Sequence, residues 1–422
     1  MRDVQGKNVI VIGAGRSGRA AARLAADLGA DVLVSESRGR ENVPAEFQQW
    51  CDEGGAGAEY GRHSRDKICA GDLIIVSPGV RRDAEPLVWA REAGIPVIGE
   101  MEFAFSRCPA RVIAVTGSNG KTTVTTLIGR ALEQAGEKVC VCGNIGFPLS
   151  EYIHQLTPEH IVVLEVSSFQ LETVETFRPW IGLCLNITQN HLDRHADMAE
   201  YTSLKQRLFQ NQTAGDIAIL NDRDPVVREF AENCRAEVVF FNTPEQRDRT
   251  GWDHPNYLAA AAAVEGAGLD LSICRQVFED FAGLEHRLED VRELNGVTYI
   301  NDSKSTTLEA SRWALERQDR PVVWICGGRD KGLDYSSLTG DAVENVTLMI
   351  IFGEAREKIR QAFLDEVDVR LADDLEQAVN IARMCAHPGQ CVLLSPMCAS
   401  FDMFENYEHR GREFKRLVSE LE

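Results

Sequence analysis

Residues 111–123 read RVIAVTGSNGKTT, and this stretch decides which kind of fold the chain can adopt. An apolar, β-branched run ends in a turn bracketed by Gly117 and Gly120, and a lysine, two threonines and a helical pattern follow. Backbone N–H groups in such a turn can surround a phosphate, because glycine has no Cβ to keep the phosphate away. Lys121 can then reach the outer phosphates, and the hydroxyl of Thr122 can ligate Mg²⁺. The stretch predicts a phosphate-binding loop between a strand and a helix.

The loop departs from the strict P-loop pattern, GxxxxGK[ST], at one position. The first glycine of that pattern would fall where Val115 stands. A short GK[ST] sequence is common by chance, so an ordinary turn between a strand and a helix is the alternative interpretation. The apolar run VIAV before the loop and the helical pattern after it favour phosphate binding.

Short β-branched runs alternate with longer Ala/Leu-rich segments along the whole chain. The runs include NVIVI at 8–12, LIIVSP at 73–78, IVVLEVS at 161–167 and VVWICGG at 322–328. This alternation is typical of βαβ units that build mainly parallel sheets. With 422 residues the chain is too long for a single core. We therefore expect three α/β domains, at residues 1–108, 109–289 and 290–422.

Charge and cysteine content restrict the possible functions. The chain carries 45 basic and 65 acidic residues, and the net charge of −20 disfavours nonspecific binding to nucleic acid or to a membrane surface. An anionic ligand would need a local basic pocket. The 12 cysteines include no CxxC pair and fit reduced thiols. Because we find no apolar signal region and no 18-residue apolar span, we expect a soluble cytoplasmic protein.

A second glycine-rich turn follows the first apolar run. Gly13, Gly15 and Gly18 form GAGRSG, and Glu36 stands 18 residues after Gly18, at the end of the next run. This spacing is that of a dinucleotide-binding turn with an acid for the ribose. Taken alone, the turn supports an NAD-dependent dehydrogenase, but that interpretation leaves GSNGKT unexplained.

Polar side chains follow the expected strands of the central region. Glu165 ends one run, where a carboxylate can hold Mg²⁺ directly or through water. His191 lies in LNITQNHLDRH after the next run and is a candidate second ligand, with a solvated loop histidine as the alternative. Zinc is disfavoured, because no cysteine or paired histidine has the spacing of a tetrahedral site. Lys205 lies in a helical pattern and, from the residues alone, reads as a solvated lysine.

The last third of the chain has three further polar turns after apolar runs. They are INDSKSTT at 300–307, CGGRDKG at 326–332 and SPMCASF at 395–401. Each is an ordinary loop on its own. Together they place polar and glycine-bearing turns at the carboxyl ends of three strands, where a ligand crevice is expected.

In combination, these motifs resemble those of the Mur ligase family over essentially the whole chain. The matching segments are GAGRSG, SPGV at 77–80, TGSNGKTT, GNIG at 143–146, LEVSSFQLE, LNITQNHLDRH, the lysine of YTSLKQRL, EHR, NDSKSTT, CGGRDKG and SPMCASFDMFENYEHRGREF. The last segment resembles the branch that adds D-glutamate more than those that add L-alanine or a diamino acid. The resemblance implies a Rossmann-like N-terminal domain, a P-loop ATPase central domain and a Rossmann-like C-terminal domain.

The resemblance also implies an activity: an ATP-dependent amide ligase that joins UDP-N-acetylmuramoyl-L-alanine to D-glutamate in peptidoglycan precursor synthesis. UDP-substrate contacts would be Gly15, Arg16, Ser17, Glu36, Ser37, Arg38, Ser77, Pro78, Gly79 and Asn144. ATP contacts would be Gly117, Ser118, Asn119, Gly120, Lys121, Thr122, Thr123, Arg287, Asn301 and Asp302. D-glutamate contacts would be Thr306, Lys331, Ser400, Phe401 and Tyr407. Mg²⁺ would be held by Thr122, Glu165, His191 and Lys205, with Lys205 carbamylated, and the catalytic set would be Lys121, Lys205, His191 and Lys304.

One segment departs from the family pattern. The family carries GxHNxxNxxAA in the central domain, and this chain has GWDHPNYLAAAAA. Asn256 matches the second asparagine, while Trp252 and Asp253 stand where histidine and asparagine are expected. The preceding stretch, FFNTPEQRDRTG, also looks shortened, as if a pair of strands were missing.

Three other functions remain alternatives at this point: a sister Mur or folylpolyglutamate-type ligase for a different amino acid, a dehydrogenase, and a non-catalytic nucleotide-binding scaffold. The ligase interpretation requires ATP and Mg²⁺. We further expect a monomer with small-molecule substrates and with no nucleic-acid or membrane partner.

Overall fold

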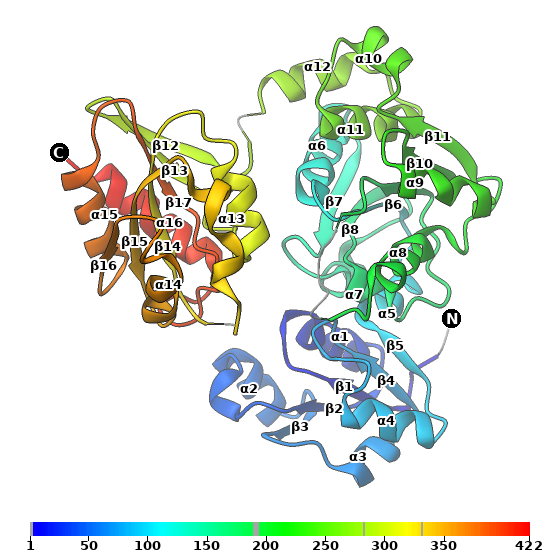
Figure 1. Ribbon diagram of the computed structural model, residues 1–422. Helices are drawn as coiled ribbons and strands as arrows, with labels where there is room; N and C mark the ends of the chain where they lie inside the picture. Colours follow the sequence, from blue (N-terminus) through cyan, green and yellow to red (C-terminus); the bar gives the residue numbers. More distant parts are fainter. Residues whose placement is uncertain (1–2, 189–193, 282, 331) are drawn as a thin grey trace. The chain divides into compact units, whose positions relative to one another are not determined.

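The computed structural model describes residues 3–188, 194–281, 283–330 and 332–422, which form three β-sheets flanked by helices (Figure 1). Contacts divide the chain into two compact units, Met1–Phe281 and Ala282–Glu422. The first unit contains two sheets and the second contains one. The prediction of three α/β parts with mainly parallel sheets is confirmed, and the domain boundaries after residues 108 and 289 stay predictions.

The first sheet has five parallel strands in the order β3-β2-β1-β4-β5. The strands are β1 (Asn8–Ile12), β2 (Asp31–Glu36), β3 (Gly57–Tyr60), β4 (Leu73–Val76) and β5 (Val97–Gly99). The helices are α1 (Arg16–Asp27), α2 (Ala45–Asp52), α3 (Arg65–Cys69), α4 (Glu85–Glu92) and α5 (Glu100–Phe105). The strand order reverses between β1 and β4, and parallel sheets bind ligands outside the carboxyl ends of strands at such a point. The turns after β1 and β4 therefore flank the expected crevice.

The second sheet has six parallel strands in the order β11-β10-β9-β6-β8-β7. The strands are β6 (Arg111–Thr116), β7 (Lys138–Gly143), β8 (His160–Glu165), β9 (Ile181–Cys184), β10 (Ile217–Asn221) and β11 (Glu237–Phe241). The helices are α6 (Lys121–Gln134), α7 (Ser168–Leu171), α8 (Met198–Gln206), α9 (Pro225–Glu229), α10 (Pro244–Thr250), α11 (Pro255–Gly266) and α12 (Ser272–Glu279). Since β6 lies between β8 and β9, the ends of these two strands flank the loop after β6.

The third sheet has six strands in the order β12-β13-β17-β14-β15-β16, all parallel except for the antiparallel pair β12 and β13. The strands are β12 (Glu289–Leu294), β13 (Val297–Asn301), β14 (Val322–Gly327), β15 (Val346–Phe352), β16 (Val369–Leu371) and β17 (Cys391–Leu394). The helices are α13 (Leu308–Leu315), α14 (Arg356–Phe363), α15 (Leu375–Cys385) and α16 (Tyr407–Ser419).

Core packing explains why the strands read as unbroken apolar runs. In β14, Trp324 belongs to one buried cluster while Val323 and Ile325 belong to another. Successive side chains point to opposite faces of a strand, so both faces of this sheet are buried. In the second sheet the alanine run 259–263 lies in α11 and is buried with the apolar face of α6. Among the residues that the structure describes, no helix is long and apolar enough to cross a membrane.

Candidate active site

The loop between β6 and α6 has a backbone that only glycine permits at two positions. Gly117 has a φ of +147° and Gly120 a φ of +84°. A Cβ on Gly117 would lie 2.9 Å from Leu185 Cβ, and one on Gly120 would lie 2.6 Å from Asn256 Oδ1. The predicted order of strand, turn and helix is present, and α6 directs its N-terminus, with its positive dipole end, toward this loop.

Side chains after β9 hold this phosphate-loop candidate, residues 117–120, in place. Asn186 Oδ1 accepts a hydrogen bond from the Asn119 N–H at 2.8 Å, and Asn186 Nδ2 donates to Asn119 O at 3.1 Å. Ser118 Oγ donates to Thr188 O at 3.1 Å and lies 3.0 Å from the hydroxyl of Tyr201. The loop is therefore fixed by a neighbouring strand end and by α8, which carries Tyr201.

Lys121 is the first residue of α6 and folds back over the loop. Its Nζ donates to Gly117 O at 2.8 Å and to Ser118 O at 2.9 Å. This places an ammonium group beside the N-terminus of α6, where a phosphate could bind. The seven predicted ATP contacts of the first unit, residues 117–123, thus occupy one continuous loop and helix start directly after β6.

Glu165 is the last residue of β8 and is 2% exposed. Its Oε1 accepts a hydrogen bond from Asn144 Nδ2 at 2.6 Å. Its Oε2 is buried and has no hydrogen-bond partner among the residues that the structure describes. A buried carboxylate oxygen without a partner is unfavourable, and Mg²⁺ prefers oxygen ligands of this kind. The orphaned oxygen therefore fits the predicted role of Glu165 as a metal ligand.

Lys205 lies on α8 and is 1% exposed, so the alternative of a solvated helix lysine is wrong. Its Nζ donates to Gly117 O at 2.9 Å and lies 4.7 Å from the ring centroid of Tyr201. Burial, and next the charge of Lys121, lower the pKa of Lys205 to about 7. Near neutral pH, the side chain is therefore an uncharged, nucleophilic amine in a large share of the molecules.

Two predicted site residues, His191 and Lys331, lie outside the residues that the structure describes. Within the described part of the chain, no group of three or more His, Cys, Asp or Glu side chains could hold a metal ion. Glu165 and the buried hydroxyl residue Thr122 are the described members of the predicted metal set besides Lys205.

All ten predicted UDP-substrate contacts line one pocket of about 800 Å³ in the first unit. Its walls come from the turn after β1, the end of β2, the loop after β4 and the loop after β7. Asn144 lines this pocket and also donates to Glu165. The pocket and the metal-ligand candidate are thus joined through one side chain.

Glu36 is buried at the wall of this pocket. Its Oε2 accepts from the Ala14 N–H at 2.7 Å, and its Oε1 accepts from the Arg38 N–H at 2.9 Å and from Arg38 Nε at 3.0 Å. Burial acts to raise the pKa of Glu36, but the hydrogen bonds from Arg38 and Ala14 outweigh it and lower the pKa to about 2. The carboxylate therefore ties the glycine turn to the segment that carries Arg38.

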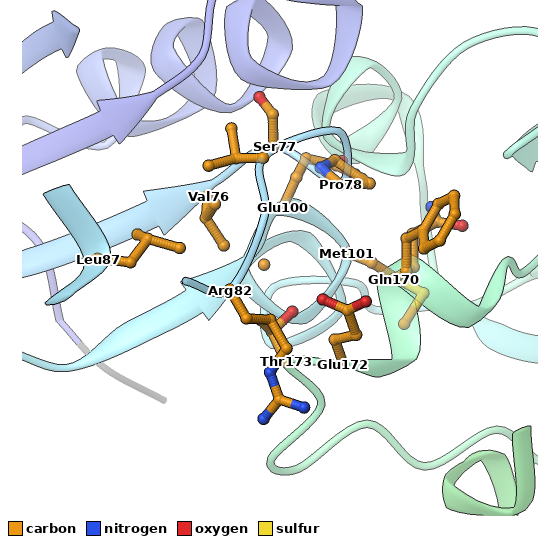
Figure 2. A pocket seen from close by; sticks show the side chains of 13 residues that line it. Val76, Ser77, Pro78, Arg82, Leu87, Glu100, Met101, Gln170, Glu172 and Thr173 are labelled. Carbon is orange, nitrogen blue, oxygen red and sulfur yellow. The ribbon is translucent and has the colours of Figure 1, made fainter. Parts of the chain in front are cut away.

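A cavity of about 20 Å³ lies between the loop after β4 and the segment around α7. Figure 2 shows Val76 and Leu87 on its left, Gln170 and Glu172 on its right, and Pro78 at the upper right. Burial raises the pKa of Glu172, although Arg194 opposes this shift. Arg194 was not among the predicted contacts. Its position within the polar cluster of LNITQNHLDRH was the available signal.

In the second unit, the predicted ATP residues Asn301 and Asp302 are buried at the end of β13. Asn301 Nδ2 donates to Glu289 Oε2 at 3.1 Å, and Asp302 Oδ2 accepts from Ser395 Oγ at 2.9 Å. Burial raises the pKa of Asp302 to about 6. Arg287, the third predicted ATP residue of this unit, is partly exposed.

The predicted D-glutamate residues of the second unit differ in exposure. Ser400 is buried, Phe401 is 62% exposed, and Thr306 and Tyr407 are intermediate. Lys304 Nζ lies 5.6 Å from the ring centroid of Tyr407. Arg410, which was not predicted, donates to Ser303 O at 2.9 Å and to Cys398 O at 3.2 Å. These hydrogen bonds join the turn after β13 to the turn after β17.

Two aromatic residues of the segment that departs from the family pattern, Trp252 and Tyr257, pack against the core of the first unit. Trp252 lies 4.8 Å from the ring of Phe278, and Tyr257 stacks on the same ring at 4.8 Å. Asn256, at the start of α11, approaches the phosphate-loop candidate closely at Gly120. The tryptophan thus occupies a structural position.

Comparison with known proteins identifies the class. Family models match residues 7–99 (Mur ligase MurD-like, N-terminal domain), 115–263 (Mur ligase middle domain) and 286–398 (Mur ligase, glutamate ligase domain). The chain belongs to the Mur ligase family. It is 38% identical over 452 residues to the UDP-N-acetylmuramoylalanine--D-glutamate ligase of Pelotomaculum thermopropionicum, covering 100% of this chain and 99% of that one. It is 40% identical over 444 residues to the enzyme of the same name from Geotalea uraniireducens, covering 99% and 98%.

Solved structures show the same fold at lower identity. The UDP-N-acetylmuramate-alanine ligase of Thermotoga maritima matches with a TM-score of 0.59 and 17% identity, over 98% of this chain and 100% of that one. The MurF ligase of the same organism, in complex with ADP, matches with a TM-score of 0.59 and 17% identity, over 99% and 96%.

Proposed function

We propose that this chain is an ATP-dependent ligase that joins D-glutamate to UDP-N-acetylmuramoyl-L-alanine in peptidoglycan precursor synthesis. Full-length relatives of this name support the proposal. The main structural support is Asn144, which lines the pocket of about 800 Å³ and also hydrogen bonds to Glu165 beside the phosphate-loop candidate. Family membership also explains the GAGRSG turn without a dehydrogenase, because that turn lies within the matched N-terminal domain.

The reaction proceeds in two steps. The terminal carboxylate of UDP-N-acetylmuramoyl-L-alanine attacks the γ-phosphorus of ATP, which breaks the bond to ADP and gives an acyl phosphate. The amine of D-glutamate then attacks the acyl carbon, forms the amide, releases phosphate and loses a proton. Phosphate leaves readily whereas a carboxylate oxygen does not, and this difference is why the γ-phosphoryl group is transferred first.

Residues of the first unit support the phosphoryl transfer. The ammonium of Lys121 and the N-terminus of α6 stabilise negative charge on the transferring group, while the N–H groups of Ser118 and Asn119 bond to Asn186 and fix the loop. Thr122 and Glu165 supply oxygen ligands for Mg²⁺, which when bound neutralises charge on the phosphates. His191 is proposed as a further ligand.

Lys205 is proposed to carry a carbamate. The uncharged amine attacks CO₂, loses a proton and becomes an anionic carbamate that can support the metal. Support for this proposal comes from the pKa of about 7 and from the burial of the side chain near Gly117 and Lys121.

In the second unit, the proposed D-glutamate-binding residues are Thr306, Lys331, Ser400, Phe401 and Tyr407. The proposed ATP-binding residues are Arg287, Asn301 and Asp302. Lys304 is proposed as a catalytic residue. We also propose that the protein acts as a monomer on these small molecules in the cytoplasm, where ATP is supplied.

A phosphate-release assay tests the proposal directly. Purified protein with ATP and Mg²⁺ should release phosphate only when both UDP-N-acetylmuramoyl-L-alanine and D-glutamate are present. Replacing D-glutamate with L-alanine or diaminopimelate separates this ligase from its sisters. Phosphate release that does not depend on D-glutamate would contradict the proposal, and failure to bind ATP would favour a non-catalytic scaffold.

A further inference from the structure

We propose that Arg194 is a positioning residue for the UDP-linked substrate, because it fixes the loop formed by residues 77–80. Ser77, Pro78, Gly79 and Val80 all line the pocket of about 800 Å³. The inference rests on the proposed function, since it assigns that pocket to the UDP-linked substrate.

The guanidinium of Arg194 binds three successive carbonyl oxygens of this loop. Nη1 donates to Gly79 O at 3.1 Å, and Nη2 donates to Pro78 O at 3.2 Å and to Val80 O at 2.7 Å. The side chain is 12% exposed, so these charge-assisted hydrogen bonds are largely shielded from water. The guanidinium holds five N–H donors in one rigid plane, which suits it to several fixed acceptors at once.

Arg194 is itself held from the side of α7. Its Cζ lies 4.7 Å from the ring centroid of Phe169, and its Nη2 lies 3.6 Å from Glu172 Oε2. The next residue, His195, is also fixed, because its Nε2 lies 3.0 Å from Ser168 Oγ. Arg194 lies between β9 and α8 of the second sheet, and it therefore fixes the loop after β4 of the first sheet.

Besides Arg194, the loop is held by a hydrogen bond from the Val80 N–H to Ser77 O at 3.0 Å and by Val80, which packs against a buried cluster of the first sheet. Ser77 Oγ donates to Gly13 O at 3.1 Å and anchors one end. Beneath the loop lies the cavity of about 20 Å³ seen in Figure 2, lined by Pro78 and Val80 among others. Close packing supports a segment on all sides, and a cavity removes part of that support. The hydrogen bonds of Arg194 therefore carry much of the restraint on this wall of the pocket.

The phosphate-loop candidate is restrained by other side chains. Residues 117–120 hydrogen bond to Asn186, Thr188 and Tyr201, whereas Arg194 hydrogen bonds to residues 78–80. Loss of Arg194 should therefore weaken binding of the UDP-linked substrate without a matching loss of ATP binding. If Arg194 only attracted the substrate through its positive charge, lysine could replace it.

The test uses the full-length variants Arg194→Met and Arg194→Lys, with Arg207→Met as the matched control. Arg207 lies in a short 3₁₀ turn after α8 and donates to Glu172 O at 2.7 Å, so its loss also removes an arginine-to-carbonyl bond. For each protein, the Kd of UDP-N-acetylmuramoyl-L-alanine is measured by calorimetry without ATP, alongside the KM for ATP and the thermal unfolding midpoint.

We expect Arg194→Met and Arg194→Lys to raise this Kd by about tenfold or more, with the KM for ATP changed less than about twofold. Arg207→Met should lower the unfolding midpoint and leave the Kd near the wild-type value. Wild-type affinity in Arg194→Met, full recovery in Arg194→Lys, or an equal loss of ATP affinity would each overturn the proposal.

Hydrogen exchange of the ligand-free proteins separates this inference from the proposed function. The Val80 N–H donates to Ser77 O at 3.0 Å and reports directly on the order of the loop. Its exchange should accelerate in Arg194→Met and not in Arg207→Met, and unchanged exchange would overturn the positioning role. If wild-type protein bound no UDP-linked substrate while exchange still accelerated, the proposed function would fail and the restraint by Arg194 would stand.

Discussion

The glycine turn after β1 and the phosphate-loop candidate after β6 share a backbone plan but differ in charge. Both follow a buried parallel strand and lead into a helix. In the first turn, the carboxylate of Glu36 accepts the Ala14 N–H. In the second, the ammonium of Lys121 donates to Gly117 O, and Lys205 donates to the same carbonyl oxygen. Glycines therefore set the shape of each turn, whereas the charged partner decides which ligand it suits.

The largest expected effect comes from removing the cation of the second turn. Lys121→Ala should reduce phosphate release by about 1,000-fold or more, because a group that stabilises charge on the transferring phosphoryl is lost. Binding of UDP-N-acetylmuramoyl-L-alanine, measured by calorimetry, should stay within about twofold, since Lys121 does not line that pocket.

Lys138→Ala is the matched control for Lys121→Ala. Lys138 is an exposed lysine of the same sheet that pairs with Glu159 at 2.5 Å, and its loss should leave phosphate release unchanged. A loss of UDP-substrate binding in Lys121→Ala would refute the division of labour between the two turns.

The buried lysine of the second turn gives the next effect. Lys205→Ala should lower the rate of phosphate release by about 100-fold, and added formate or acetate should restore part of it if a carbamate normally occupies the position. Rates are compared with and without each acid at fixed ionic strength. Absence of rescue together with a low rate would leave Lys205 as an unmodified lysine rather than a carbamate.

The two turns also show what the sequence could and could not predict. Lys121 and Glu165 were predictable because both lie at the ends of apolar runs, and parallel strands gather their carboxyl ends at one edge. The UDP-substrate contacts were predicted from the family resemblance. Lys205 resembled a solvated residue, because its acceptor Gly117 O lies 88 positions away in the sequence. Arg194 was missed for the same reason, since Val80 O lies 114 positions away. Local periodicity carries no information on such contacts.

Backbone shape at the first turn can be tested by a pair of glycine substitutions. A Cβ on Gly18 would lie 1.8 Å from Gly13 O, whereas a Cβ on Gly15 would have no atom within 4 Å. Gly18→Ala should therefore lower the free energy of unfolding by about 3 kcal/mol, because backbone must move. Gly15→Ala should change it by less than about 1 kcal/mol. Urea unfolding measures both, and equal losses would contradict the close approach of α1 to the turn.

The charge of the first turn predicts a pH dependence of stability. The folded pKa of Glu36, about 2, lies below its ordinary value of 4.5. The carboxylate therefore stabilises the fold above about pH 4.5, and this contribution is lost as the pH falls toward 2. Glu36→Gln should destabilise the protein at pH 7, with a difference from wild type that shrinks between pH 4.5 and 3.

Glu46→Gln provides the comparison for Glu36→Gln. Glu46 pairs with Arg23 but its side chain is 82% exposed, so its loss should have little effect at any pH. Urea unfolding of the three proteins at pH 7, 4.5 and 3 measures these differences. A Glu36→Gln difference that stayed constant with pH would show that packing, not the ionised carboxylate, holds Ala14 and Arg38. The first turn would then be set by shape alone, and the contrast in charge with the second turn would no longer explain their different ligands.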